Sequence, residues 1–266
     1  MTRLARLESH LGTYGRVLLG YSGGVDSALL AVVATRVLGP GRFLAAIGRS
    51  ASYPEAQWRV AIELSARFAI PLLEVDTHEL ADPRYLANPT NRCYFCKSEL
   101  WRVLGAVAAK RGYDVLIDGT NADDLSEHRP GFRAGQERQV RAPLAELGWT
   151  KAMVREAAQA QGIPIWDAPA APCLSSRVAY GLAITPDRLR QVELAEAFLR
   201  GLGVQGDLRV RHHGSRARIE VLPAELARLT GVWGQVEDRF GELGFPAVEL
   251  DPRGYRRGSL LPVVTA

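Results

Sequence analysis

Short apolar segments alternate with helix-like segments along the first two thirds of the chain, and this alternation restricts the possible folds most strongly. Each apolar segment has the length of one buried strand and is bounded by glycine, proline or polar residues. Five strands are predicted, at residues 16–21, 43–47, 71–75, 115–118 and 140–144. The predicted helices lie at residues 4–11, 27–38, 55–68, 100–111 and 151–161. Strands that alternate with helices form a parallel sheet with helices on both faces, so the predicted fold class is α/β.

The order of the predicted elements changes after Pro186. One helix is followed by two short strands around Gly214, then by a second helix and a last strand. These elements are predicted at residues 187–202, 207–213, 216–222, 224–243 and 247–250. We therefore expect two domains, an α/β domain at residues 1–180 and a small α+β domain at residues 186–266.

The composition is that of a globular protein with a sizeable core, since 47% of the 266 residues are hydrophobic and 23% are charged. No apolar run reaches the roughly 18 residues of a membrane span. Charged side chains interrupt the N-terminal segment, so no signal peptide is expected and we predict a cytoplasmic protein without a membrane partner. The net charge of +4, from 33 basic and 29 acidic residues, is too small to indicate nucleic-acid binding.

The segment SGGVDS lies directly after the first predicted strand and directly before a helix. Its two glycines allow backbone N–H groups at the helix N-terminus to approach an oxyanion closely, and the helix dipole favours negative charge there. Its hydroxyl groups can add donors, and its carboxylate can hold the loop or bind a metal ion. The residues of this predicted phosphate site are Ser22, Gly23, Gly24, Val25, Asp26 and Ser27. A Walker A loop is excluded because the sequence lacks its glycine spacing and its lysine.

A second polar segment, DGTNADD, follows the fourth predicted strand. Since the carboxyl ends of parallel strands form the edge where open α/β sheets bind ligands, we expect it beside SGGVDS. By itself, such a segment would be only a turn. Its candidate nucleotide-binding residues are Gly119, Thr120, Asn121 and Asp123. Lys151, at the start of a later helix, is either a further phosphate ligand or, more simply, a solvated lysine.

All three cysteines lie in two predicted loops at this same edge. Cys93 and Cys96 have the C-x2-C spacing that brings two thiolates onto one metal ion or cluster, and Cys173 lies in the segment PCLSSR. Three thiolates would leave one iron of a [4Fe-4S] cluster without a protein ligand. A zinc site with three cysteines and a histidine, a redox pair at Cys93 and Cys96, and three unrelated buried cysteines are the alternatives.

The segment SGGVDS resembles the pyrophosphate loop of the ATP pyrophosphatase superfamily, whose members include NAD synthetase, GMP synthetase and the tRNA thiolases. Further motifs narrow this resemblance, and together they are similar to the LarE family of ATP-dependent sulfur transferases. These motifs are NRCYFCK, DGTNADD, PLAELGWTK, PCLSSR and the C-terminal segment DPRGYRRGS, so the likeness covers nearly the whole chain. It implies an adenine-nucleotide alpha-hydrolase-like sheet in the first domain.

The resemblance implies an enzyme of nickel-pincer nucleotide biosynthesis that uses ATP and Mg2+. Its substrate would be pyridinium-3,5-biscarboxylic acid mononucleotide, whose carboxylates are adenylated and become thiocarboxylates. Members with a single cysteine, at the position of Cys173, sacrifice its sulfur. Members with three cysteines are thought to bind a [4Fe-4S] cluster that carries an extra sulfide. Since Cys93 and Cys96 are present, the chain resembles the second kind, with Cys173 as the catalytic cysteine and third cluster ligand.

Five further residues are candidate ligands for the phosphate or the carboxylates of that substrate. Ser176, Arg177 and Glu196 resemble phosphate-binding residues of the family. Arg209 and Arg211, two residues apart on a predicted strand, would point to one face of the sheet. That face is either part of the substrate site or an ordinary solvated strand face.

Three other classes stay open from the sequence. A tRNA thiolase also joins a pyrophosphate loop to cysteines, but it should carry an RNA-binding module or a strongly basic surface. An ammonia-using synthetase such as NAD synthetase would not need cysteines at these positions. A nucleotide- or metal-binding regulatory protein would keep the fold without cleaving ATP. The resemblance also implies a homo-oligomer, whereas the sulfide donor cannot be identified from the sequence.

Overall fold

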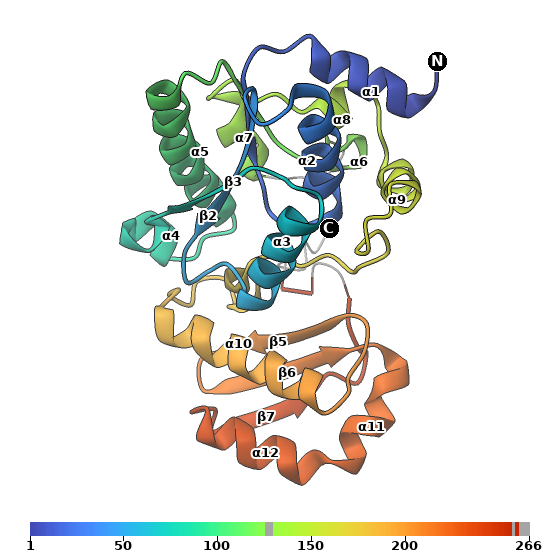
Figure 1. The fold of residues 1–266 in the computed structure, drawn as a ribbon. Helices are drawn as coiled ribbons and strands as arrows, with labels where there is room; N and C mark the ends of the chain where they lie inside the picture. The colour runs from blue at the N-terminus through green and yellow to red at the C-terminus, as the bar shows by residue number, and fades with distance from the viewer. Residues whose placement is uncertain (126–129, 257–258, 261–266) are drawn as a thin grey trace, which may run out of the picture. The chain divides into compact units, whose positions relative to one another are not determined.

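The structure is a computed structural model that describes residues 1–125, 130–256 and 259–260. The chain divides into two compact units, each with its own sheet and its own hydrophobic core (Figure 1). Unit 1 contains Met1–Glu79 and Asn91–Ala171, and unit 2 contains Leu80–Thr90 and Pro172–Ala266. Within the described ranges, no helix is both long enough and apolar enough to span a bilayer.

Unit 1 is built on a four-stranded parallel sheet with the strand order β3-β2-β1-β4. Its strands are β1 (Val17–Gly20), β2 (Phe43–Arg49), β3 (Leu72–Asp76) and β4 (Val115–Ile117). The central strand β1 is buried on both faces, and its Val17 pairs with Phe43 on one side and Val115 on the other. The predicted α/β fold is therefore confirmed, and the strand order reverses between β1 and β4, where open sheets of this kind bind ligands.

Helices cover both faces of this sheet. The longer ones are α1 (Arg3–Gly12), α2 (Val25–Leu38), α3 (Glu55–Arg67), α5 (Arg92–Arg111), α7 (Pro130–Gln136) and α9 (Lys151–Ala160). The core on one face is built around side chains from α1, α2, α3 and α9. On the other face, Trp101 and Leu104 of α5 pack with Ala134 of α7 against β1 and β2. Two short helices complete the unit, α6 (Ala122–Leu125) and α8 (Pro143–Glu146).

Two sequence-based expectations in unit 1 are wrong. The segment 140–144 is not a fifth strand: only Arg141 forms an isolated bridge to Ile117, and Pro143 begins the short helix α8. Proline suits the first turn of a helix and lacks the N–H that a ladder needs, so the pairing ends there. Helix α5 begins at Arg92 and not at Leu100. The sequence analysis missed its first two turns because they carry no apolar stripe. Cys93 and Cys96 therefore lie on a helix and not in a loop.

Unit 2 has a three-stranded sheet with the order β5-β6-β7. Its strands are β5 (Leu208–His212), β6 (Arg216–Val221) and β7 (Ala247–Leu250). The pair β5–β6 is antiparallel, as the predicted hairpin requires, and β7 adds in parallel to β6. Its helices are α4 (Pro83–Leu86), η2 (Leu174–Arg177), α10 (Pro186–Gly201), η3 (Pro223–Glu225), α11 (Leu226–Gly231) and α12 (Trp233–Glu242), and the short helix η1 (Glu79–Ala81) begins on the last residue of unit 1.

The single helix predicted at 224–243 is instead broken in the middle. Helix α11 ends at Gly231 and α12 begins at Trp233, with Val232 between them at a φ of −123°. Glycine and β-branched residues have low helix propensity, and the sequence Thr230–Gly231–Val232 places them together. Leu229 on one piece and Val236 and Phe240 on the other are all buried in the core of the unit. The break therefore lets both pieces contribute to that core.

The bounds of the two compact units differ from those of the two domains expected from the sequence, 1–180 and 186–266. These two domains stay a prediction. Unit 2 begins at Pro172 and also takes in Leu80–Thr90, which lies in the first third of the chain. Contacts between residues far apart in sequence decide this grouping, and a pattern of local periodicity does not reveal them.

Candidate functional site

The SGGVDS segment connects the end of β1 to the start of α2. Gly23 has a φ of +68°, a left-handed conformation, and a Cβ atom there would lie 2.8 Å from the Cβ of Ala61. Gly24 caps α2, whose first helical residue is Val25. The N–H groups of a first helical turn have no partner within the helix, so they are available to an anion at this end.

Serine hydroxyl groups hold this loop in shape. Ser27 Oγ donates to the carbonyl of Gly24 at 3.0 Å and accepts from the backbone N–H of Ser22 at 3.3 Å. Ser22 Oγ lies 3.1 Å from Ser27 Oγ. In this structure the two hydroxyl groups are used inside the loop, which leaves the backbone of the first turn of α2 as the surface that an oxyanion would meet.

The DGTNADD segment packs directly on the start of α2. A Cβ atom on Gly119 would lie 2.9 Å from the backbone nitrogen of Ser27, so only glycine permits this approach. Asn121, which is 2% exposed, donates from Nδ2 to Asp26 Oδ1 at 3.1 Å. Thr120 joins the same turn through its N–H, which donates to Asp118 Oδ1. The structure therefore brings together the two segments that the sequence predicted at one edge of the sheet.

Lys151 completes this group of side chains. Its ammonium group lies 2.5 Å from Asp26 Oδ2, and its backbone N–H donates to Asp123 Oδ2 at 2.8 Å. Lys151 stands at the first position of α9, after Thr150, whose hydroxyl group caps that helix. The ammonium is therefore held by a carboxylate of the loop while the Lys151 side chain stays 37% exposed, and its role as a phosphate ligand stays a prediction.

The oxygen atoms gathered here have the chemistry of a Mg2+ site. Carboxylates are hard ligands, and Mg2+ at nucleotide sites takes one or two of them together with phosphate oxygens and water. Asp26, in the first turn of α2, and Asp123, in α6, supply carboxylates from the two segments that meet at Asn121. These two residues are the ones that would hold such a metal ion.

Two residues of α3 and the turn before it also hold the phosphate loop, and the sequence analysis missed both. Tyr53 Oη donates to the carbonyl of Ser22 at 2.9 Å, and Gln57 Nε2 donates to the same oxygen at 3.3 Å. Burial raises the pKa of Tyr53, so its hydroxyl group stays protonated and remains a donor. Their partner lies about 30 residues earlier, so no local motif marks them.

The cysteine pair lies in the first two turns of α5. Cys93 is exposed and Cys96 is half-buried. Residues three apart share one face of a helix, so two thiols at this spacing can serve one metal centre. In the described part of the chain, no three His, Cys, Asp or Glu side chains gather into a metal site. The role of the pair as cluster ligands therefore stays a prediction.

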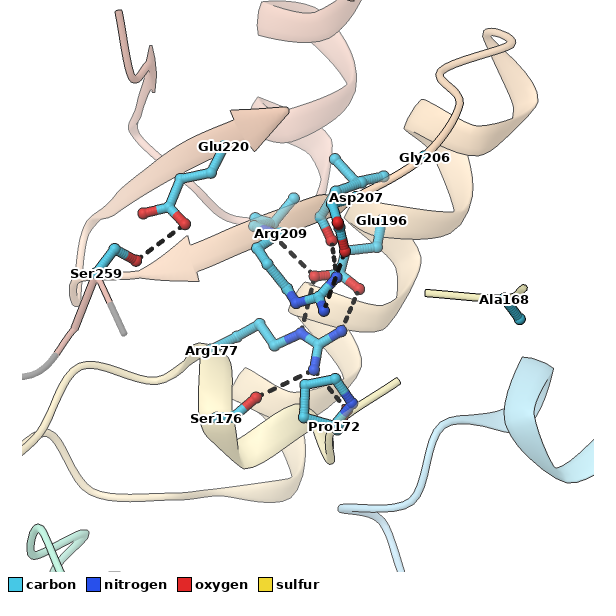
Figure 2. Close-up of polar contacts among 12 residues, drawn as sticks. Ala168, Pro172, Ser176, Arg177, Glu196, Gly206, Asp207, Arg209, Glu220 and Ser259 are labelled. Atoms are coloured by element: carbon cyan, nitrogen blue, oxygen red, sulfur yellow. Dashed lines mark hydrogen bonds and ion pairs between the residues drawn. The ribbon is translucent and has the colours of Figure 1, made fainter. Parts of the chain in front are cut away.

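Cys173 lies in unit 2, directly before η2, in a loop that Arg177 organises. The Arg177 guanidinium is 4% exposed and makes two parallel hydrogen bonds to Glu196, Nε to Oε1 at 2.9 Å and Nη2 to Oε2 at 3.0 Å. Nη1 donates to the carbonyls of Pro172 and Cys173 and to Ser176 Oγ. Figure 2 shows this guanidinium between the loop and the Glu196 carboxylate. Glu196 therefore holds Arg177 in place. Since a carboxylate repels a phosphate, the part of Glu196 in a phosphate site would be this indirect one.

The strand β5 carries two buried arginines, so the interpretation of a solvated strand face is wrong. Arg209 and Arg211 are 5% and 6% exposed. Arg211 pairs with Glu220 of β6, with Nη2 2.8 Å from a carboxylate oxygen, and donates from Nη1 to the carbonyl of Ser176 at 3.1 Å. Glu220 itself is 1% exposed and was not singled out from the sequence.

Arg209 is paired with Asp207 at 3.8 Å and lies close enough to Arg177 and Glu196 to feel the charge of both. Burial, and then the charge of Arg177, lower the pKa of its guanidinium, while Glu196 and other groups oppose that effect. Figure 2 shows the Arg177 and Arg209 side chains directed toward Glu196 from different elements. In this structure each of the three arginines of the cluster has a carboxylate partner, and their role as ligands of a phosphate or a carboxylate stays a prediction.

The C-terminal DPRGYRRGS segment contributes in part to this cluster. Ser259 Oγ donates to Glu220 at 3.0 Å and accepts from Arg211 Nη2 at 2.9 Å. Arg257 and Gly258 of the same segment lie outside the described residues.

Comparison with known proteins gives matches over nearly the whole chain. Residues 6–85 match the family model described as NAD synthase. The chain is 31% identical over 264 residues to the pyridinium-3,5-bisthiocarboxylic acid mononucleotide synthase of Lactiplantibacillus plantarum, and the match covers 99% of this chain and 95% of that protein. An uncharacterized protein of Synechocystis is 43% identical, with 99% and 98% covered, and one of Methanocaldococcus jannaschii is 30% identical, with 91% of each chain covered.

Proposed function

Because the chain belongs to the LarE family, to which the synthase from Lactiplantibacillus plantarum belongs, we propose that it is an ATP-dependent sulfur transferase of nickel-pincer nucleotide biosynthesis. Its substrate would be pyridinium-3,5-biscarboxylic acid mononucleotide, and its product the corresponding thiocarboxylate. The observation that carries this proposal is the convergence of the SGGVDS and DGTNADD segments, through Asn121 and Asp26, at one edge of the sheet in unit 1.

In the first step, a substrate carboxylate oxygen would attack the α-phosphorus of ATP, forming an acyl adenylate and releasing pyrophosphate. The N–H groups at the start of α2 would stabilise the negative charge on the departing pyrophosphate. Asp26 would exchange the Lys151 ammonium for Mg2+, and Lys151 would then be available to the phosphates. Bound Mg2+ supplies charge neutralisation on the phosphate oxygens. In the second step, sulfur would attack the acyl carbon, and AMP would leave.

The substrate phosphate would bind to the arginines of unit 2. Arg209 and Arg211 supply buried positive charge, Ser176 adds a hydroxyl group, and Arg177 keeps the loop after Cys173 in place through Glu196. Arginine suits this task because its planar guanidinium matches two oxygens of a phosphate or carboxylate at once.

The sulfur would come from a [4Fe-4S] cluster held by Cys93, Cys96 and Cys173. Such a cluster supplies sulfur at the sulfide level, so Cys173 would act as a ligand and would not be consumed. Support comes from the two thiols that share one face of α5 and from the third free cysteine in the organised loop of unit 2. In the competing interpretation, Cys173 is itself the donor and loses its sulfur in each turnover.

The other partners follow from the same proposal. The protein would bind a nucleotide-type small molecule and no nucleic acid, form homo-oligomers, and work in the cytoplasm, where its three cysteines stay reduced. The protein that replaces the sulfide is not identified by this chain.

The test is to measure iron and acid-labile sulfide, with an absorption spectrum, on anaerobically reconstituted wild type and on a Cys93→Ala variant. We expect about four irons per chain in the wild type and a loss of the cluster in the variant. The matched activity assay follows AMP, pyrophosphate and thiocarboxylate formation from the purified substrate.

The outcomes separate the function from the sulfur donor. Cleavage of ATP without any thiocarboxylate, or no substrate-dependent cleavage, would overturn the proposed function. Thiocarboxylate formation without iron, accompanied by the loss of one sulfur atom from Cys173 in the mass spectrum, would overturn only the cluster and assign the donor role to Cys173.

A further inference from the structure

The segment Leu80–Thr90 belongs to unit 2 although it lies between β3 and α5 in the sequence. Its Tyr85 is 1% exposed, and the hydroxyl group lies 2.5 Å from the Oγ of Ser175, which is 0% exposed. Ser175 is two residues after Cys173. A hydrogen bond between two fully buried hydroxyl groups restrains both side chains, because breaking it away from water carries a desolvation cost.

Asn88 makes the second set of contacts. This side chain is 0% exposed, and Nδ2 donates to the carbonyls of Val178, Ala179 and Leu182 at 3.2, 2.8 and 3.0 Å. Its backbone has a φ of +51°, a conformation that asparagine tolerates better than most residues. One amide group therefore gathers three carbonyls of the loop that follows Cys173.

Backbone hydrogen bonds also join the segment Leu80–Thr90 to the loop after Cys173. The N–H of Gly181 donates to the carbonyl of Asn88 at 3.0 Å, and the N–H of Ile184 donates to the carbonyl of Leu86 at 2.9 Å. On its other side, the same loop joins the sheet of unit 2, where the N–H of Ala179 donates to the carbonyl of His212. The loop after Cys173 is thus held between β5 and the segment Leu80–Thr90.

We propose that Tyr85 and Asn88 are positioning residues for the Cys173 thiol. They do so by fixing the backbone on the C-terminal side of Cys173, while Arg177 fixes the carbonyls of Pro172 and Cys173. The same segment ends at Thr90, three residues before Cys93 in the sequence. The proposal rests on the proposed function, in which Cys173 is the thiol that handles or ligates sulfur.

The variants Tyr85→Phe and Asn88→Gly test it in the full-length protein. Tyr85→Phe removes only the hydroxyl group, and Asn88→Gly removes the N–H donors while it tolerates the φ of +51° at this position and buries no charge. We measure the rate at which iodoacetamide alkylates each cysteine of the apoprotein, by mass spectrometry of its peptides. Loss of the one hydrogen bond of Tyr85 to Ser175 should raise the rate at Cys173 about fivefold, and loss of the three from Asn88 should raise it at least as much, with Cys93 unchanged in both variants.

Tyr14→Phe is the matched control, since it removes a hydroxyl group that is hydrogen-bonded to Glu146 and His10 in unit 1. It should leave the alkylation of Cys173 at the wild-type rate. A double variant, Tyr85→Phe with Ser175→Ala, should alkylate at nearly the rate of Tyr85→Phe alone, because both changes break the same contact. General loosening of the fold would instead make the two effects multiply.

The second readout is iron per chain after anaerobic reconstitution. Variants that keep the wild-type melting temperature and ATP affinity should hold as little iron as Cys173→Ala. Wild-type alkylation rates in both variants, or an equal change in Tyr14→Phe, would overturn the positioning role. If the wild type itself takes up no iron, the cluster proposal fails, while the alkylation rates still decide the role of Tyr85 and Asn88.

Discussion

In unit 1 the candidate site is made largely of backbone, whereas in unit 2 it is made of charged side chains buried in the protein. Gly23 and Gly119 of unit 1 let main chain approach main chain, and the free N–H groups at the start of α2 face the expected ligand. In unit 2, Arg177 and Arg211 are almost fully buried and each is paired with a carboxylate.

This difference determines what each site tolerates. A site made of closely packed backbone should be sensitive to added volume, because no space is available for an extra methyl group. A site made of buried charges should be sensitive to the removal of one charge, because the partner is left unpaired in a medium of low polarity. The following predictions test that contrast, from the largest expected effect to the smallest.

The largest effect is expected for Glu220→Gln in unit 2. The change leaves the buried Arg211 guanidinium without its carboxylate, and breaking such a pair costs about 3 kcal/mol of the free energy of unfolding. Urea denaturation measures it. The control is Glu249→Gln, which removes the carboxylate that pairs with Arg216 and Arg218. All three of these side chains are much more exposed than Arg211 and Glu220, so the change should cost less than about 1 kcal/mol. Equal costs for the two variants would contradict the contrast.

The second effect is expected for Gly119→Ala in unit 1. The new Cβ atom would lie 2.9 Å from the backbone nitrogen of Ser27 and 3.2 Å from its Cα, so the phosphate loop must move. Overpacking of this kind costs about 1–3 kcal/mol, which corresponds to roughly tenfold to hundredfold weaker binding of a non-hydrolysable ATP analogue. Isothermal titration calorimetry measures the affinity. Gly105→Ala, which adds a methyl group to open space in α5, should leave it unchanged.

The ion pair of Arg141 and Glu146 in unit 1 is partly exposed, so its contribution to stability should lie between those of the buried and the exposed pairs of unit 2. Burial alone would raise the pKa of Glu146, but hydrogen bonds from Arg141, His10 and the N–H of Ala142 outweigh it and lower the pKa to about 2. Because the pKa is lower in the folded protein than the ordinary 4.5, the carboxylate stabilises the fold above pH 4.5, and this contribution disappears as the pH falls toward 2.

Glu146→Gln should therefore lower the free energy of unfolding by about 1 kcal/mol at pH 7 and flatten its decline between pH 4.5 and pH 2. Urea midpoints at four pH values across this range measure the slope. An unchanged slope in the variant would show that Glu146 is not responsible for the acid sensitivity.

The smallest effect concerns the cysteine helix. A Cβ atom on Gly131 of α7 would lie 3.0 Å from Lys97 Cγ and 3.3 Å from the carbonyl oxygen of Cys93, whereas one on Gly135 would come no closer than 3.5 Å to its nearest neighbour, Trp101. Gly131→Ala should push α7 away from the cysteine pair and raise the alkylation rate of Cys93 about twofold. Gly135→Ala should not, and a similar rise in both variants would refute the link.

The elements that the sequence predicted correctly are those whose signal is local. Strands β1 to β4 follow from short apolar runs, and the phosphate loop follows from two glycines between a strand and a helix. The prediction was wrong at 140–144 and at the start of α5. Pro143 ended the pairing in the first case, and in the second the helical turn that carries Cys93 has no apolar stripe.

The remaining site residues depend on contacts that no local pattern contains. Tyr53, in the turn after β2, donates a hydrogen bond to Ser22, which lies 31 positions earlier in the sequence. Tyr85 contacts Ser175, which lies 90 positions later. Glu220 reads as an ordinary polar residue of an exposed hairpin until its pairing with Arg211 is known. The sequence therefore indicates the chemistry of the site well, and the residues that hold it in place poorly.

The membership of Leu80–Thr90 in unit 2 has a consequence for how the protein is made. During synthesis the ribosome releases Tyr85 and Asn88 long before Ser175 and Val178, their partners, exist. Until then, the hydrogen bonds of Tyr85 to Ser175 and of Asn88 to Val178 cannot form, although all four strands of the parallel sheet are already present in the chain once β4 has been made. The loop of Cys173 can therefore mature only as one of the last events of folding, after translation has passed most of the chain.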